Sequence, residues 1–144
     1  MSHWQTGKLD LKCSLNILKK ALINIMPDWE KHLLVDEKGN LEASFHGGAV
    51  SQKYQMVVPG TKGGIKNLYT DIGMFQESDG SWSIGGDYSI ESLKTKLSSE
   101  VMRMKAIAIA KLRGYEIVRN DDDGEEIVTD IRVDSDKVKE LLHA

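Results

Sequence analysis

The segment "NDDDGEE", residues 120–126, holds five carboxylates and one glycine within seven positions, a density that suggests calcium binding. An EF-hand loop places oxygen ligands at positions 1, 3 and 5, glycine at position 6 and a bidentate glutamate at position 12. Asp121 to Gly124 match positions 3, 5 and 6, but position 1 is Arg119, whose charge repels a metal ion. Position 12 is Asp130, which is short for the bidentate role, and the flanks lack helical periodicity. The segment is therefore interpreted as an acidic hairpin turn.

Other residues that could carry chemistry are poorly spaced for it. The four histidines have no ligand partner three or four residues away, and the single cysteine, Cys13, belongs to no C-x-x-C pair, so zinc is not indicated. "GSWSIGG", residues 80–86, resembles a nucleophile elbow, but G-x-S-x-G requires a glycine two residues before Ser83, where Ser81 stands. The sequence thus predicts no catalytic residue, no metal and no cofactor.

The best anion-binding candidate is the loop "PGTKGGIKN", residues 59–67, in which glycines expose backbone N–H groups while Lys62 and Lys66 supply charge. It lacks the G-x-x-x-x-G-K-[ST] pattern of a phosphate-binding P-loop, and a plain connection between strands is the favoured interpretation. A weaker enzyme hypothesis combines these glycines with His46 and Asp71, which only the fold could bring together.

Charge is distributed unevenly along the chain. Net charge is −3, from 19 basic and 22 acidic side chains, yet residues 90–114 hold six basic and two acidic ones while residues 119–144 hold four and nine. Lys94, Arg103 and Lys111 therefore become candidate binding residues on a basic helix. Trp82 is an aromatic candidate beside them, although tryptophan in a domain of this size usually covers the core.

The elements that must position these residues follow from hydrophobic periodicity. Residues 9–13 alternate as a half-buried strand, Ser14 offers an N-cap, and residues 15–25 repeat at helical spacing until Pro27 stops the helix. Residues 90–112 form a long second helix with one apolar face, and Gly114 suits its C-terminal cap.

Five short strands are predicted between the helices, at residues 33–35, 41–45, 54–58, 65–76 and 81–84, and a final hairpin joins residues 115–119 with 127–133. The resulting order, β-α-β-β-β-β-β-α-β-β, is a single α+β domain over residues 1–144, with an antiparallel sheet and two helices packed on one face. Its predicted core consists of Leu11, Leu15, Leu18, Leu22, Ile25, Leu97, Val101, Met104, Ile117, Ile131 and Val133.

A family resemblance comes from several short motifs in order: "MSHW", "LNILKKAL", "DW", "WSI" and "GYEIV". With them the chain resembles an uncharacterised hypothetical chloroplast reading-frame family of algal plastids and cyanobacteria, as a divergent bacterial or viral relative. The resemblance covers most of the chain, with "VMRMKA" standing where the family carries an aromatic-rich segment. The resemblance implies an accessory role, with an ATPase system of the AAA+ class as the partner. It assigns no catalytic residues to this chain.

These observations favour a non-catalytic cytoplasmic binding or accessory domain that acts through a protein partner. The single cysteine and the lack of an apolar leader or a span of about 20 apolar residues favour a reducing compartment without a membrane. The alternative is a nucleic-acid-binding protein that uses the basic helix together with Lys62 and Lys66. The sequence leaves open whether the chain forms a homo-oligomer.

Overall fold

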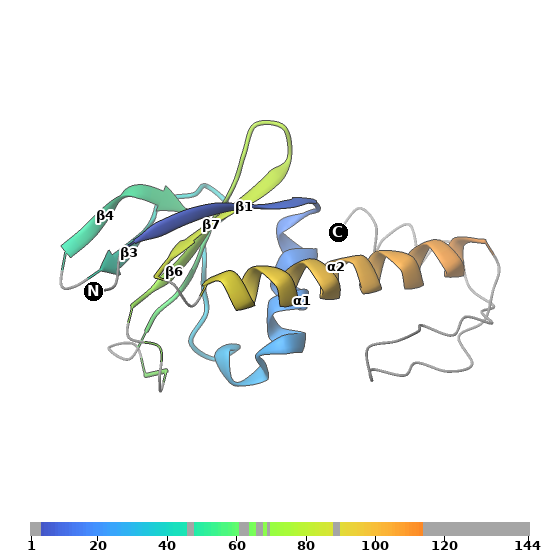
Figure 1. Ribbon diagram of the computed structural model, residues 1–144, viewed down its shortest axis with the longest axis horizontal. Helices are drawn as coiled ribbons and strands as arrows, with labels where there is room; N and C mark the ends of the chain where they lie inside the picture. Colours follow the sequence, from blue (N-terminus) through green and yellow to red (C-terminus); the bar gives the residue numbers. More distant parts are fainter. Residues whose placement is uncertain are drawn as a thin grey trace.

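The computed structural model describes residues 4–45, 48–60, 64–65, 68, 70–87 and 90–113 (Figure 1). Five antiparallel strands form the main sheet in the order β1-β7-β6-β5-β2. The other two strands form a separate hairpin, β3-β4. The strands are β1 (Gln5–Lys12), β2 (Leu34–Val35), β3 (Leu41–Phe45), β4 (Gly48–Tyr54), β5 (Met56–Val58), β6 (Ile72–Gln76) and β7 (Ser81–Gly86), and the helices are α1 (Leu15–Ile25), the short 3-10 helix η1 (Pro27–Trp29) and α2 (Ile90–Leu112).

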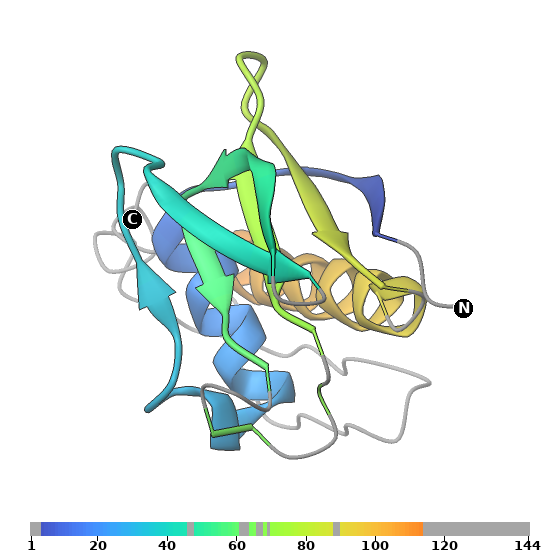
Figure 2. The same cartoon turned by 90° about the vertical axis from the view of Figure 1, so that its left-hand side faces the viewer.

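The sheet is covered on both faces. Helices α1 and α2 lie against one face and the β3-β4 hairpin lies over the other (Figure 2). Alternation along the strands explains this: in β5, Met56 and Val58 join the core under the helices while Val57 joins the cluster under the hairpin. The predicted α+β class, with both helices on one face of an antiparallel sheet, is confirmed.

Helix α1 begins and ends where its sequence predicts. Ser14 has an extended backbone, and its side-chain oxygen accepts a hydrogen bond from the Ile17 N–H at 3.2 Å, which satisfies one of the free donors of the first turn. Pro27 follows the helix and opens η1. The apolar face of α1, with Leu18, Ala21 and Leu22 fully buried, points into the main core.

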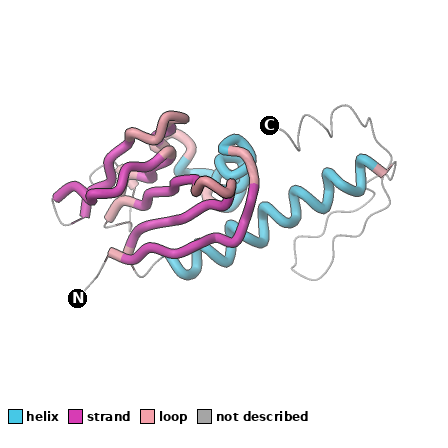
Figure 3. The backbone as a smooth tube through the Cα atoms, turned by 90° about the horizontal axis from the view of Figure 1, so that it is seen from above, coloured by secondary structure: helices cyan, strands magenta, loops and turns pink. Residues whose placement is uncertain are grey.

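Helix α2 crosses α1 and then continues past the sheet, so that its C-terminal half extends beyond the strands (Figures 1 and 3). One polar cluster joins α1 and α2 where they cross. Glu100 accepts two hydrogen bonds from the Arg103 guanidinium, both at 2.8 Å, and one from the Asn24 side chain of α1 at 2.9 Å. Because the Glu100 side chain is only 11% exposed, this cluster is a partly buried ion pair.

The smaller cluster under the hairpin is built around Tyr54. Its ring is fully buried and makes an edge contact with Phe75, with ring centroids 5.8 Å apart. It lies directly on Gly73 of β6, where an added Cβ would stand 2.6 Å from the ring carbons. Glycine is therefore required at this position by close packing. Burial raises the pKa of the Tyr54 hydroxyl, and the neighbouring Trp4 indole partly opposes that shift.

The strands between the helices differ from the prediction in three respects. The described residues hold six strands there, because Gly48–Tyr54 forms a strand that was not predicted. The strand predicted at residues 65–76 is shorter, since β6 spans only Ile72–Gln76 and the described residues from 64 to 71 form no strand. The predicted strand 54–58 is divided at Gln55, whose backbone N–H bonds to the Met74 carbonyl and whose side chain accepts from the Gln76 N–H. The chain passes at Gln55 from the hairpin to the main sheet. The predicted hairpin of residues 115–133 and the cap at Gly114 lie outside the described residues.

The core prediction is confirmed where the structure describes it. Five of the predicted residues are buried: Leu11, Leu18, Leu22, Leu97 and Val101. Three more, Leu15, Ile25 and Met104, are partly buried and pack against the same cluster. The remaining three, Ile117, Ile131 and Val133, lie outside the described residues.

Candidate functional site

Two of the predicted binding residues, Lys62 and Lys66, lie outside the described residues. The described parts of their loop are tied into the fold. The Gly60 N–H donates to the Asp71 carboxylate at 2.9 Å, and the same carboxylate accepts from the Ser44 N–H at 2.8 Å. Asp71 therefore holds the hairpin against the loop, and His46, its partner in the enzyme hypothesis, also lies outside the described residues.

The three predicted cations of α2 do not share one face. Each residue of an α-helix turns by about 100°, so Lys94 and Arg103, nine residues apart, point in directions that differ by about 180°. Lys94 extends over Gly7 of β1 and pairs loosely with Glu91 at 3.7 Å, while Arg103 is engaged by Glu100. Lys111 stands in the last turn. Together these three residues do not form a continuous basic patch.

The indole of Trp82 is part of the core. It has no exposed surface, and its Nε1–H donates a hydrogen bond to the Cys13 carbonyl at 2.8 Å. A side chain without exposed surface cannot contribute to an open binding surface, so the interpretation of Trp82 as a core tryptophan is the one that the structure supports.

The C-terminal half of α2 instead exposes apolar side chains. Met102 is 65% exposed, Ile109 45% and Leu112 38%. With the exposed Ala106, they follow one another at spacings of three and four residues, which places them on one side of the helix. These four residues are called the α2 apolar surface below. Leu112 is exposed because the sheet does not reach the end of the helix.

The charge of this half-helix is of one sign. Residues 101–113 contain Arg103, Lys105, Lys111 and Arg113 and no acidic residue. Lys105 is partly engaged, since its ammonium donates to the Lys12 carbonyl at the end of β1. The α2 apolar surface thus lies on a helix segment whose side chains are all cationic or apolar. Met102 and Ile109 are the most exposed large side chains of this surface.

The sequence contained a signal for this surface. Val101, Met104 and Ala108 account for the face that packs on the domain, and Met102, Ala106 and Ile109 add apolar side chains on another side. A helix that is apolar on more than one side requires more than one partner. The prediction of a basic binding helix considered only the charged side chains and so did not include this surface.

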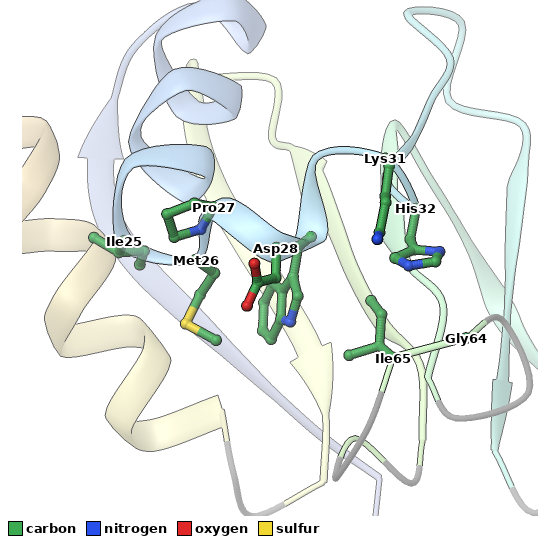
Figure 4. Close-up of a pocket in the computed structure, with 9 residues that line it drawn as sticks. Ile25, Met26, Pro27, Asp28, Lys31, His32, Gly64 and Ile65 are labelled. Carbon is green, nitrogen blue, oxygen red and sulfur yellow. The ribbon is translucent and has the colours of Figure 1, made fainter.

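A second candidate site is a pocket of about 540 Å³ at the end of α1 (Figure 4). It is called the Trp29 pocket below. Asp28, Lys31 and His32 bring a carboxylate, an ammonium group and an imidazole to one opening, and the loop residues Gly64 and Ile65 lie next to His32. The remaining lining residues are Ile25, Met26, Pro27 and Trp29.

Within the described ranges, no group of three or more His, Cys, Asp and Glu side chains is placed to hold a metal ion. No helix in that part of the chain is both long and apolar enough to span a bilayer. The acidic segment 120–126 lies outside these ranges.

Comparisons of this chain with protein-family models, curated proteins and solved structures give no match.

Proposed function

We propose that the protein is a non-enzymatic cytoplasmic binding domain that docks onto a protein partner through the α2 apolar surface. The observation that carries this proposal is the exposure of Met102, Ile109 and Leu112 on one side of a helix that extends beyond its own sheet. Contiguous exposed apolar side chains rimmed by polar ones are typical of interaction surfaces. The free thiol of Cys13 is compatible with a reducing compartment.

The chemistry of the partner follows from the charge of the helix segment. Arg103 is paired with Glu100 and Lys105 donates to the Lys12 carbonyl, so the charge offered to a partner is that of Lys111 and Arg113 at the end of the helix. They favour a partner that presents an apolar ridge bordered by carboxylates. A second copy docked by the same surface would place these cations against each other across a twofold axis, and such like-charge contacts oppose association.

A nucleic acid is the competing occupant, because the same cations attract phosphates. Methionine, isoleucine and leucine side chains offer no hydrogen-bond donor to a phosphate, however, and phosphate contacts dominate such interfaces. The exposed apolar side chains therefore favour a protein. The resemblance to the hypothetical chloroplast reading-frame family points to the same kind of accessory role.

A matched pair of variants tests the proposal in the full chain. We expect Met102→Gln combined with Ile109→Gln to lower recovery of the partner about tenfold or more, a loss of about 1.4 kcal/mol or more in binding free energy. Ser92→Gln, at an exposed position nearer the start of α2, is the control and should bind like the wild type. The measurement is affinity purification of tagged chains from the native cell or host, with and without nuclease, followed by quantitative mass spectrometry.

The outcomes separate the hypotheses. A protein that survives nuclease, binds the control and is lost with the double variant supports docking through the α2 apolar surface. If the double variant keeps every association of the wild type, the docking proposal is wrong. If all associated proteins disappear with nuclease and binding weakens steeply with salt, the occupant is a nucleic acid.

A further inference from the structure

We infer that the Trp29 pocket binds a small zwitterion with an apolar side chain, of the amino-acid or dipeptide class. This inference does not depend on the α2 apolar surface. The pocket has a volume of about 540 Å³, within the range of roughly 300–1,000 Å³ that is common for small-molecule sites. Among the described residues, its lining combines an acidic side chain, a basic side chain and an imidazole with apolar walls, a combination that matches both ends and the body of such a ligand.

The polar groups of the pocket are available to a ligand. Within the described part of the chain, the side chains of Asp28, Lys31 and His32 make no hydrogen bond or ion pair. Elsewhere in the fold, two acidic side chains are engaged: Asp71 accepts two backbone N–H groups, and Glu100 accepts from Arg103 and Asn24. The pocket therefore gathers charged groups that the fold itself does not use.

Backbone hydrogen bonds fix the turns that carry these groups. The Trp29 N–H donates to the Met26 carbonyl at 3.0 Å, and the Trp29 carbonyl accepts from the N–H groups of His32 at 2.9 Å and Leu33 at 3.0 Å. Two successive tight turns thus hold residues 28 to 32 around one opening. A site whose backbone is held before binding loses less conformational entropy when a ligand arrives.

The loop that lies against His32 is also constrained. Ile65 is 6% exposed and belongs to the main core, so it cannot swing away without opening that core. Next to it, Gly64 has a φ of +102°, and an added Cβ would stand 2.9 Å from Cε1 of the His32 ring. Glycine at this position lets the loop lie against the imidazole, and this contact joins the loop to the turn after η1.

The arrangement assigns a role to each group. In Figure 4, Lys31 and His32 lie on one side of the opening, Ile25 and Met26 on the other, and Asp28 between them. A ligand carboxylate is expected at Lys31 and His32, a ligand ammonium at Asp28, and an aliphatic side chain against the apolar wall. Because the opening is in contact with water, the expected dissociation constant is on the order of 1 mM.

The test is an NMR titration of the ¹⁵N-labelled full chain with L-leucine and L-leucyl-L-leucine. Saturable shifts are expected at the backbone amides of residues 28–33 and 64–65. N-acetyl-L-leucine lacks the ammonium and L-leucinamide lacks the carboxylate, and each should bind at least about fivefold more weakly than leucine.

Two variants assign the charges. Asp28→Asn should remove the preference for leucine over N-acetyl-leucine, and Lys31→Met should remove the preference over leucinamide. Lys38→Met, which changes an exposed lysine outside the pocket, is the control and should keep both preferences. Saturation by leucyl-leucine alone identifies the ligand as a dipeptide and supports the inference. The inference is overturned if neither zwitterion saturates these amides by 10 mM, a tenfold excess over a dissociation constant of about 1 mM, or if both analogues bind as well as leucine.

Discussion

Replacing Trp82 by alanine is expected to lower the free energy of unfolding by about 3–5 kcal/mol. The indole has no exposed surface, lies between the sheet and the helices, and donates to the Cys13 carbonyl at the junction of β1 and α1. Its removal leaves a large cavity and ends a contact between β7 and the start of the chain. Urea denaturation followed by far-UV circular dichroism measures the change.

Trp82→Phe is the matched control for the cavity. It keeps an aromatic ring and loses the Nε1–H, while the Cys13 carbonyl still accepts from the Gln76 side chain. The expected cost is therefore smaller, about 1–2 kcal/mol. If Trp82→Ala changed stability by less than about 1 kcal/mol, as is usual for surface positions, its placement in the core would be wrong.

Replacing Glu100 by alanine is expected to cost about 1–3 kcal/mol, because one change removes the acceptor for both Arg103 and Asn24. The control is Glu91→Ala on the same helix. Glu91 also pairs with a cation three residues later, but at 3.7 Å and with 67% of its side chain exposed. Exposed pairs of this kind contribute about 0–1 kcal/mol. If chemical denaturation gave the same loss in free energy of unfolding for both variants, Glu100 would not stabilise the contact between α1 and α2 as proposed.

The same carboxylate predicts a pH dependence. Hydrogen bonds from Arg103, foremost, and from Asn24 lower the pKa of Glu100 below its usual value, although burial opposes them. A group whose folded pKa is depressed stabilises the fold above its unfolded pKa, about 4.3 for glutamate, and loses that contribution as pH falls through the folded pKa. Stability measured from pH 6 to pH 3 should therefore fall less steeply for Glu100→Gln than for the wild type. Parallel curves would contradict this assignment.

The sequence predicted those features that depend on neighbouring residues. The predicted start of α1 after Ser14 and its predicted end before Pro27 are both confirmed, because capping and helix termination depend on a few neighbouring residues. Residues 77–80, which the prediction left as the connection between two strands, form a turn: Gly80 has a φ of +89°, and hydrogen bonds link Glu77 to Gly80 and Ser81. Each of these features depends only on residues within its own segment.

Features that depend on distant residues could not be predicted in this way. Glu100 and Asn24 are 76 positions apart, and no periodicity relates them. The same applies to His32 and Gly64, which lie against each other in the lining of the Trp29 pocket and belong to different segments. Basic side chains on α2 appeared as a patch because composition counts charges without their directions, whereas the helix distributes Lys94 and Arg103 to opposite sides.

The pairing of β1 with β7 has a consequence for how the chain is made. Gln5 stands opposite Gly86, so the first strand finds its neighbour only after nearly all of the sheet has been synthesised. Until then β1 and α1 leave the ribosome with their apolar faces uncovered, and Leu9, Leu11 and Leu18 depend on later strands for burial. Such non-local closure is typical of slow folding, in milliseconds to seconds. The N-terminal unit is therefore the part of the nascent chain that most needs protection from aggregation.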